Sequence, residues 1–98
     1  ELKEALKDCD HALDLSRRDP GILDSRALVY LRLGSPSDAV IDYDEALDAD
    51  PNISTSLYGR GLAELRLGQK AQGQKDLAAA EKLDSGIAKR FAAMGLAP

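Results

Sequence analysis

The sequence predicts an all-α fold in which similar pairs of antiparallel helices follow one another. Two observations carry this prediction. The segment Leu-Arg-Leu-Gly occurs at residues 31–34 and again, 34 residues later, at residues 65–68. Apolar residues recur at spacings of three and four, which is the period of a helix, and no stretch alternates with the two-residue period of a strand.

The similarity extends well beyond these four residues. When residues 20–53 are aligned with residues 54–87, eleven positions are identical. The same register reaches backwards, so that alanines recur at 12, 46 and 80 and aspartates at 8, 42 and 76. Self-similarity at a fixed period of this length indicates an α-solenoid, in which each unit buries its apolar face against its neighbours.

The chain is interpreted as a single domain of residues 1–98, because this length supports one small core. Residues 1–19 correspond to the second helix of a partial unit, residues 20–53 and 54–85 to two full units, and residues 86–98 to a capping helix and tail. Helices are expected near residues 1–16, 20–34, 36–49, 52–68, 70–83 and 86–95.

Local signals mark the helix ends in the first full unit. Asp19 followed by Pro20 predicts a helix start, because the carboxylate accepts from free N–H groups and proline suits the first turn. Gly34 predicts the end of that helix. Ser35 is then expected to cap the next helix, which Pro36 opens.

The second full unit and the tail carry weaker signals. Gly73 stands where the first unit has an alanine, and inside a helix it is expected to cost about 0.5–1 kcal/mol relative to alanine. The last helix is expected to bury one apolar face that contains Ile87, Phe91 and Met94, with Leu96 at its end.

Composition and charge exclude several classes of protein. The net charge is −4 and the basic residues are scattered, which argues against a nucleic-acid partner, since phosphate binding needs a clustered basic face. No apolar run approaches the roughly 20 residues needed to span a membrane. The single cysteine fits a reducing compartment, and a cytoplasmic location is expected.

No residue pattern predicts catalysis, a cofactor or a metal site, so the chain is not expected to be an enzyme. Cys9 and His11 are the nearest candidates, but without a second cysteine or histidine they do not complete a zinc tetrahedron. Residues two apart on a helix also point in different directions, which disfavours a nucleophile and base pair. Cys9 is interpreted as a small core residue.

The 34-residue unit resembles the tetratricopeptide repeat, most strongly in residues 20–53. Small, aromatic, glycine and proline residues occupy all seven positions typical of this family: Ala27, Tyr30, Gly34, Ala39, Tyr43, Ala46 and Pro51. The next unit keeps three of these features, at Gly61, Gly68 and Ala80. An arginine directly before the first small residue is similar to bacterial members of the family.

Charges also repeat in register. Arg26 and Arg60 occupy the same position of successive units, and Asp8, Asp42 and Asp76 recur with the same period. We predict that each arginine lies within salt-bridge distance of one of these aspartates on a neighbouring helix. The alternative is that all five are independent, exposed charges.

The resemblance implies a right-handed superhelix in which the first helix of each unit lines a concave groove. Apolar groove residues would contact a peptide, and arginines would bind its carboxylates. By the positions of the family, the expected peptide-binding residues are Asp24, Leu28, Arg32, Thr55, Tyr58, Leu62 and Arg66. The alternative is that the leucines are buried between helices and the arginines only keep the edge hydrated.

The resemblance also implies a non-catalytic scaffold for protein–protein interaction whose partner is a protein or peptide. The alternative is an accessory or oligomerisation domain of a larger enzyme or sensor. In the repeat register Glu1 falls in the turn between two helices, so an upstream helix is expected in the intact protein. A further hypothesis is self-association through exposed terminal helices, around Leu6 or Phe91.

Overall fold

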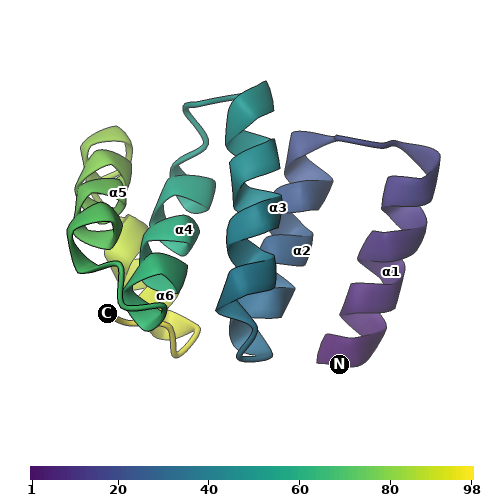
Figure 1. The fold of residues 1–98 in the computed structure, drawn as a ribbon, viewed down its shortest axis with the longest axis horizontal. Coiled ribbons are helices and arrows are strands. Elements are labelled where there is room, and N and C mark those ends of the chain that lie inside the picture. Colours follow the sequence, from purple (N-terminus) through teal and green to yellow (C-terminus); the bar gives the residue numbers. More distant parts are fainter.

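A computed structural model describes residues 1–98 as six α-helices without a strand, which confirms the predicted all-α class. The helices are α1 (Leu2–Leu15), α2 (Pro20–Arg32), α3 (Pro36–Ala49), α4 (Ser54–Arg66), α5 (Lys70–Leu83) and α6 (Ile87–Ala93) (Figure 1). Each expected helix agrees with an observed one to within two residues at either end.

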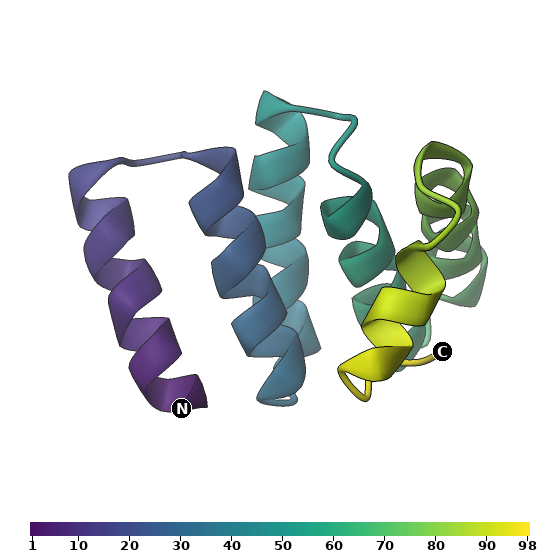
Figure 2. The same cartoon turned by 180° about the vertical axis from the view of Figure 1, so that it is seen from behind.

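The helices pack as an open row of antiparallel pairs. α2 packs against α3, and α4 packs against α5, while α1 contacts α2 at one end of the row. At the other end, α6 lies against α4 and α5 (Figures 1 and 2). This arrangement is an α-solenoid, with the elements in the order that the repeat predicts.

The ends of the first full unit's helices follow the sequence signals with one exception. The Asp19 carboxylate accepts from the backbone N–H of Ile22 at 3.1 Å, which confirms the predicted cap of α2. Ser35 makes no side-chain cap on α3, so that expectation is wrong. Its ψ of 68° lies outside the extended conformation of a capping residue, because its N–H bonds to the Tyr30 carbonyl in the glycine turn that ends α2.

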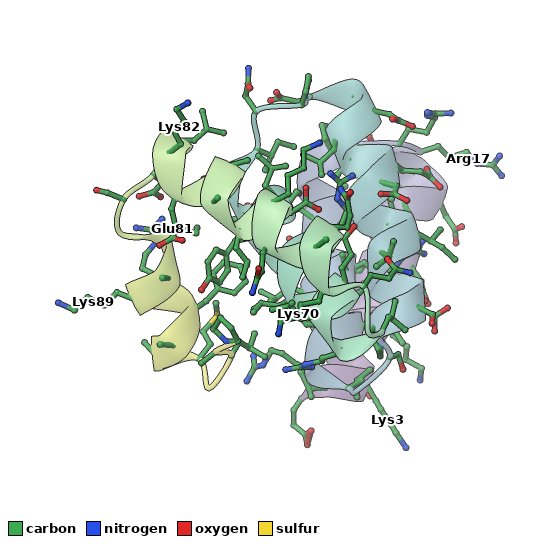
Figure 3. All side chains as sticks on the ribbon, turned by 60° about the vertical axis from the view of Figure 1, so that its left-hand side comes forward. Lys3, Arg17, Lys70, Glu81, Lys82 and Lys89 are labelled. Carbon is green, nitrogen blue, oxygen red and sulfur yellow. The ribbon has the colours of Figure 1, made fainter.

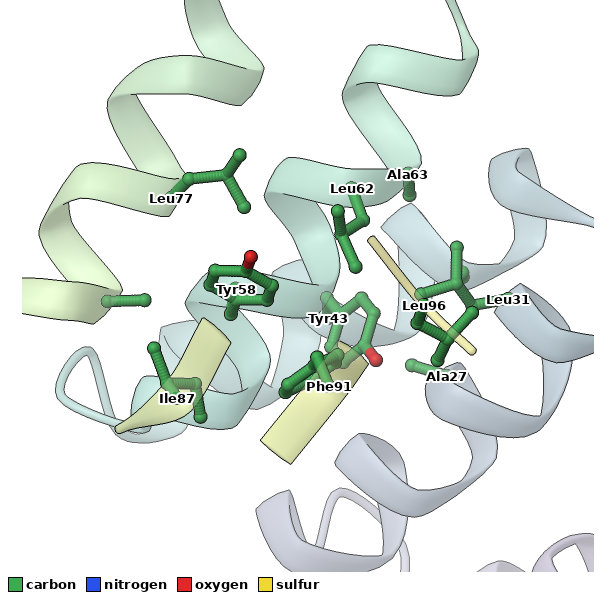
Figure 4. Close-up of a cluster of buried hydrophobic side chains, with 12 residues drawn as sticks. Ala27, Leu31, Tyr43, Tyr58, Leu62, Ala63, Leu77, Ile87, Phe91 and Leu96 are labelled. Carbon is green, nitrogen blue, oxygen red and sulfur yellow. The ribbon is translucent and has the colours of Figure 1, made fainter. Parts of the chain in front are cut away.

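The core is one main cluster of twelve buried residues that extends from α2 to the C-terminal tail (Figure 4). Ile87, Phe91 and Leu96 belong to it, as expected. Met94 does not: its side chain is 38% exposed, so its predicted burial is wrong. The reason is that α6 ends at Ala93 and the chain turns away from the helical spacing that would have buried Met94.

A smaller cluster joins α1, α2 and α3 through Leu13, Leu23 and Ala46. Ala46 is fully buried there. An Ala46→Leu substitution is therefore expected to lower the free energy of unfolding by about 1–3 kcal/mol through overpacking. Urea denaturation measures this, with Ala49→Leu on the exposed side of the same helix as a control that should change little. Equal midpoints for the Ala46→Leu variant and the wild type would contradict the packing.

Helix packing explains why position 73 is a glycine, although glycine has a low helix propensity. Gly61 of α4 and Gly73 of α5 face each other, and a Cβ built on Gly73 would lie 2.8 Å from the Gly61 carbonyl oxygen. In the first unit, the alanines 27 and 39 hold the corresponding positions and are fully buried. The α4–α5 pair therefore needs glycine for its close approach. The expected propensity cost of Gly73 is offset because a Cβ at this position would clash with the Gly61 backbone.

The close contact between Gly61 and Gly73 reverses the expected effect of Gly73→Ala on stability. Helix propensity alone would make the variant more stable, but the clash with the Gly61 backbone is expected to destabilise it by about 1–3 kcal/mol. Thermal unfolding by circular dichroism measures the change. Ala78→Gly, at an exposed position inside α5, calibrates propensity on the same helix and should cost about 0.5–1 kcal/mol. A stabilised Gly73→Ala variant would show that the two helices separate at little cost.

Candidate functional site

The seven residues expected to bind a peptide lie on α2 and α4, the first helices of the two full units. These two helices contact each other directly. The N-cap of α2 at Asp19 and the turn before α4 set where each helix begins, and so set which residues share a face. The expected residues are therefore on adjacent helices, as a shared binding surface requires.

The α4 part of this surface is covered by the chain itself. Tyr58 and Leu62 are each 2% exposed and belong to the main core. The Phe91 ring of α6 lies against the Tyr58 ring, with the ring centroids 4.8 Å apart and the planes tilted by 47° (Figure 4). The equivalent residue to Leu62 on α2, Leu28, keeps part of its surface open to solvent.

Asp24 ties the two helices together. Its carboxylate accepts hydrogen bonds from the hydroxyl groups of Thr55 and Ser56, at 3.2 and 2.6 Å. Burial raises the pKa of Asp24, and the two hydroxyl donors partly offset this rise. The free N–H groups in the first turn of α4 also favour a negative charge at this place. Asp24 and Thr55 thus have partners within the chain.

The two arginines of the surface differ. Arg66 donates to the backbone carbonyl of Leu31 at 2.9 Å, so it links the end of α4 to the end of α2. Arg32 is exposed and forms no hydrogen bond or ion pair within the chain, unlike the arginines at 26, 60, 66 and 90. Arg32 is therefore a cation beside the half-buried Leu28 with all of its donors available.

The predicted charge pairs are confirmed. Arg26 of α2 binds both carboxylate oxygens of Asp42 on α3, at 2.7 and 2.9 Å. Arg60 of α4 binds Asp76 on α5 in the same way, at 2.8 and 3.1 Å. Both aspartates are buried, and the paired carboxylates raise the pKa of each arginine. These two forked pairs hold each helix pair in register.

Sequence reasoning missed the third member of each group. Arg26 also pairs with Asp10 of α1 at 3.0 Å, and Arg60 pairs with Asp44 of α3 at 2.9 Å. Asp10 and Asp44 are 34 residues apart, so the same repeat register contained the signal. Asp8, which the prediction included, is exposed and forms no ion pair with either arginine.

Sequence reasoning also missed Glu64, whose buried carboxyl group lies beside the Arg60–Asp76 pair. Glu64 is 5% exposed, its Oε1 atom has no hydrogen-bond partner, and its Oε2 atom lies 3.9 Å from Arg60 Nε. Burial raises the pKa of Glu64 to about 8, and the nearby Asp76 carboxylate adds to the rise. In the first unit the same position holds Tyr30, whose ring lies 5.8 Å from the Arg26 guanidinium carbon.

The other candidate residues stay apart. Cys9 is half-buried on α1 and belongs to neither core cluster, so its interpretation as a core residue is wrong. Burial together with the Asp10 charge raises the pKa of its thiol, which lowers its reactivity. His11 is exposed. No three His, Cys, Asp or Glu side chains gather in an arrangement suited to a metal ion.

Comparison with known families matches residues 21–53 to the tetratricopeptide repeat. This is the first full unit, and the six helices continue the same antiparallel arrangement on either side of it, so the chain is similar to tetratricopeptide-repeat proteins. Repeats of this kind serve in general as protein–protein interaction modules. No curated protein matches the chain. None of the helices combines the length and apolar character needed to cross a membrane.

Proposed function

We propose that this chain is a non-catalytic module that binds a protein or peptide on the concave surface formed by α2 and α4. The observation that carries this proposal is the Arg32 side chain, which is exposed and unpaired beside the partly open Leu28. A cation without an internal partner next to an apolar side chain is suited to a ligand that has a carboxylate close to an apolar group.

The remaining residues have supporting parts in this proposal. Asp24 and Thr55 form a polar edge that is already hydrogen-bonded, so it shapes the surface at low ordering cost. Arg66 donates one hydrogen bond to the Leu31 carbonyl, and its other N–H donors are free to bind a ligand. Tyr58 and Leu62 form the apolar α4 part, which is covered by α6 in this structure.

An affinity pull-down with the full-length protein as bait tests the proposal. Arg32→Glu should reduce capture of the bound partner at least tenfold, because it places a like charge against the ligand carboxylate. Lys82→Glu makes the same change of charge on α5, where Lys82 projects away from the body (Figure 3), and should leave capture unchanged. Equal loss in both variants would indicate a net-charge effect, and equal retention would exclude the surface.

Self-association is a separate proposal that rests on α1. Leu2, Ala5 and Leu6 are only half-buried, because α1 packs on α2 alone. The surface around Phe91, the other one expected to self-associate, is covered, since Phe91 is 3% exposed within its own chain. Light scattering over a concentration series should show association that Leu6→Glu abolishes, whereas a monomer at all concentrations would exclude it.

A further inference from the structure

The C-terminal segment, residues 87–98, covers the α4 part of the proposed binding surface. Ile87 is fully buried, and Phe91 and Leu96 are 3% and 5% exposed, all in the core that contains Tyr58 and Leu62. Figure 2 shows α6 lying in front of α4, on the side where α2 lies in front of α3. The segment therefore occupies the same face that the α2 residues share.

This segment departs from the repeat. Gly34 and Gly68 are 34 residues apart, whereas Gly95 follows Gly68 after only 27. Gly95 has a φ of +78°, and the N–H of Leu96 bonds to the Phe91 carbonyl at 3.0 Å. This helix end returns Leu96 to the core directly after seven helical residues. The segment is thus a short helix with three apolar anchors rather than a full repeat helix.

The segment is held by its three anchors and by Ala88, which packs half-buried against the same core. Apart from the three anchors, its ion pair is the one between Arg90 and Asp84, and Arg90 is 57% exposed. Lys89, Ala92 and Ala93 face solvent. A helix of seven residues is not stable on its own, because helix nucleation is costly and isolated helices need about 12–15 residues. Its order therefore depends on docking, and chain ends are among the parts of a protein that open locally without global unfolding.

We propose that residues 87–98 are a displaceable internal occupant of the binding surface, and that an external partner helix takes their place. Its partner chemistry follows from the anchors: an amphipathic helix with an aliphatic residue and an aromatic residue four positions later, as at Ile87 and Phe91. The aromatic ring would stack on Tyr58. This inference rests on the proposed function, which it extends by naming the partner's chemistry and an autoinhibitory contact.

A labelled synthetic peptide of residues 84–98 tests this by fluorescence anisotropy against the full chain. The tethered segment competes at an effective concentration in the millimolar range, so binding to the wild type should be weak. Phe91→Ala in the protein weakens the internal contact and leaves Tyr58 intact, so the peptide should bind at least tenfold more tightly. Lys89→Ala, on the exposed face of α6, is the matched control and should bind as the wild type does.

Equal affinity for the wild type and the Phe91→Ala variant, including no binding to either, would overturn the proposal. A peptide that itself carries Phe91→Ala must also fail to bind. If circular dichroism shows that the Phe91→Ala protein unfolds, Leu96→Ala replaces it in the same comparison. Unfolding of both variants would show that residues 87–98 are an integral part of the core, and would overturn the proposal. Loss of peptide binding while Arg32 still governs partner capture would overturn displacement alone and leave the proposed function standing.

Discussion

Replacing Asp42 with alanine is expected to lower the free energy of unfolding by about 2–4 kcal/mol at neutral pH. Asp42 is 2% exposed and accepts two hydrogen bonds from Arg26. Its removal leaves a largely desolvated guanidinium with the exposed Asp10 as its remaining carboxylate partner. The magnitude lies below that of a fully buried pair, because the Arg26 side chain keeps 24% of its surface in solvent.

The equivalent Asp76→Ala substitution should cost less, about 1–2 kcal/mol. The reason is Glu64, whose carboxyl group lies 3.9 Å from Arg60 and is available as a replacement partner once Asp76 is gone. The first unit has Tyr30 at that position, which provides no replacement carboxylate for Arg26. The two units therefore form an internal comparison of the same charge pair in two surroundings.

Urea unfolding at low salt of the two single variants measures this difference, because urea is uncharged and does not screen the ion pairs. Adding Glu64→Gln to the Asp76→Ala variant removes the reserve carboxylate and should raise the loss to that of Asp42→Ala. Asp48→Ala, on the exposed side of α3, serves as the control for loss of an acidic residue. If the Asp76→Ala variant proved less stable than the Asp42→Ala variant, Glu64 would not substitute for Asp76.

Glu64→Gln alone is expected to stabilise the protein by about 2–4 kcal/mol at pH 8. Glutamine keeps the size and hydrogen-bonding capacity of the protonated acid but carries no charge to bury. The wild-type residue is 5% exposed, and the Arg60 that it approaches already binds two other carboxylates, at Asp44 and Asp76. A third negative charge in this group is therefore poorly compensated.

The pH dependence follows from the same pKa. Burial, together with Asp76, raises the pKa of Glu64 from 4.5 to about 8, so the folded state holds a proton that the unfolded state has lost. The stabilising contribution is complete below pH 4.5 and is lost as the pH rises to about 8. Asp76 acts oppositely: its contacts with Arg60 and Glu64 outweigh burial and lower its pKa, so its contribution is lost only in acid, below 3.8.

Unfolding free energies measured from pH 4 to pH 9 test this. The wild type should lose stability across pH 4.5–8, whereas the Glu64→Gln variant should have a flatter profile. Glu4→Gln, at an exposed position of α1, should keep the slope of the wild type. Parallel profiles for the wild type and the Glu64→Gln variant would show that Glu64 ionises when buried without cost.

The repeat made much of this structure predictable. A fixed period means that one packing solution is used twice, so identical residues in register meet similar neighbours. The Arg26–Asp42 and Arg60–Asp76 pairs follow from this directly. The missed partners, Asp10 and Asp44, have the same period and could have been found by aligning every charged residue rather than those of one helix position.

Other features lie where the repeat is broken. Gly73 has an unfavourable helix propensity when considered alone, and its use becomes clear only when Gly61 is seen across the helix interface. Met94 is exposed although its helical spacing predicted burial, because α6 ends before it and Gly95 turns the chain. Tyr58 is placed at a ligand-facing position by the family pattern, but α6 covers it. The Gly61–Gly73 and Tyr58–Phe91 contacts each join two different helices, so neither is visible in the local sequence.

The amino-acid sequence by itself determined the class of fold, the number and limits of the helices and the register of the charge pairs. These depend on helical spacing, on the proline and glycine residues at the helix ends, and on the repeat period of 34 residues. The tertiary structure alone decided which parts of the proposed binding surface are open, with Arg32 unpaired and Tyr58 beneath Phe91. The physical reason is that exposure depends on which distant segments pack together, and a residue's own position in a helix does not specify that.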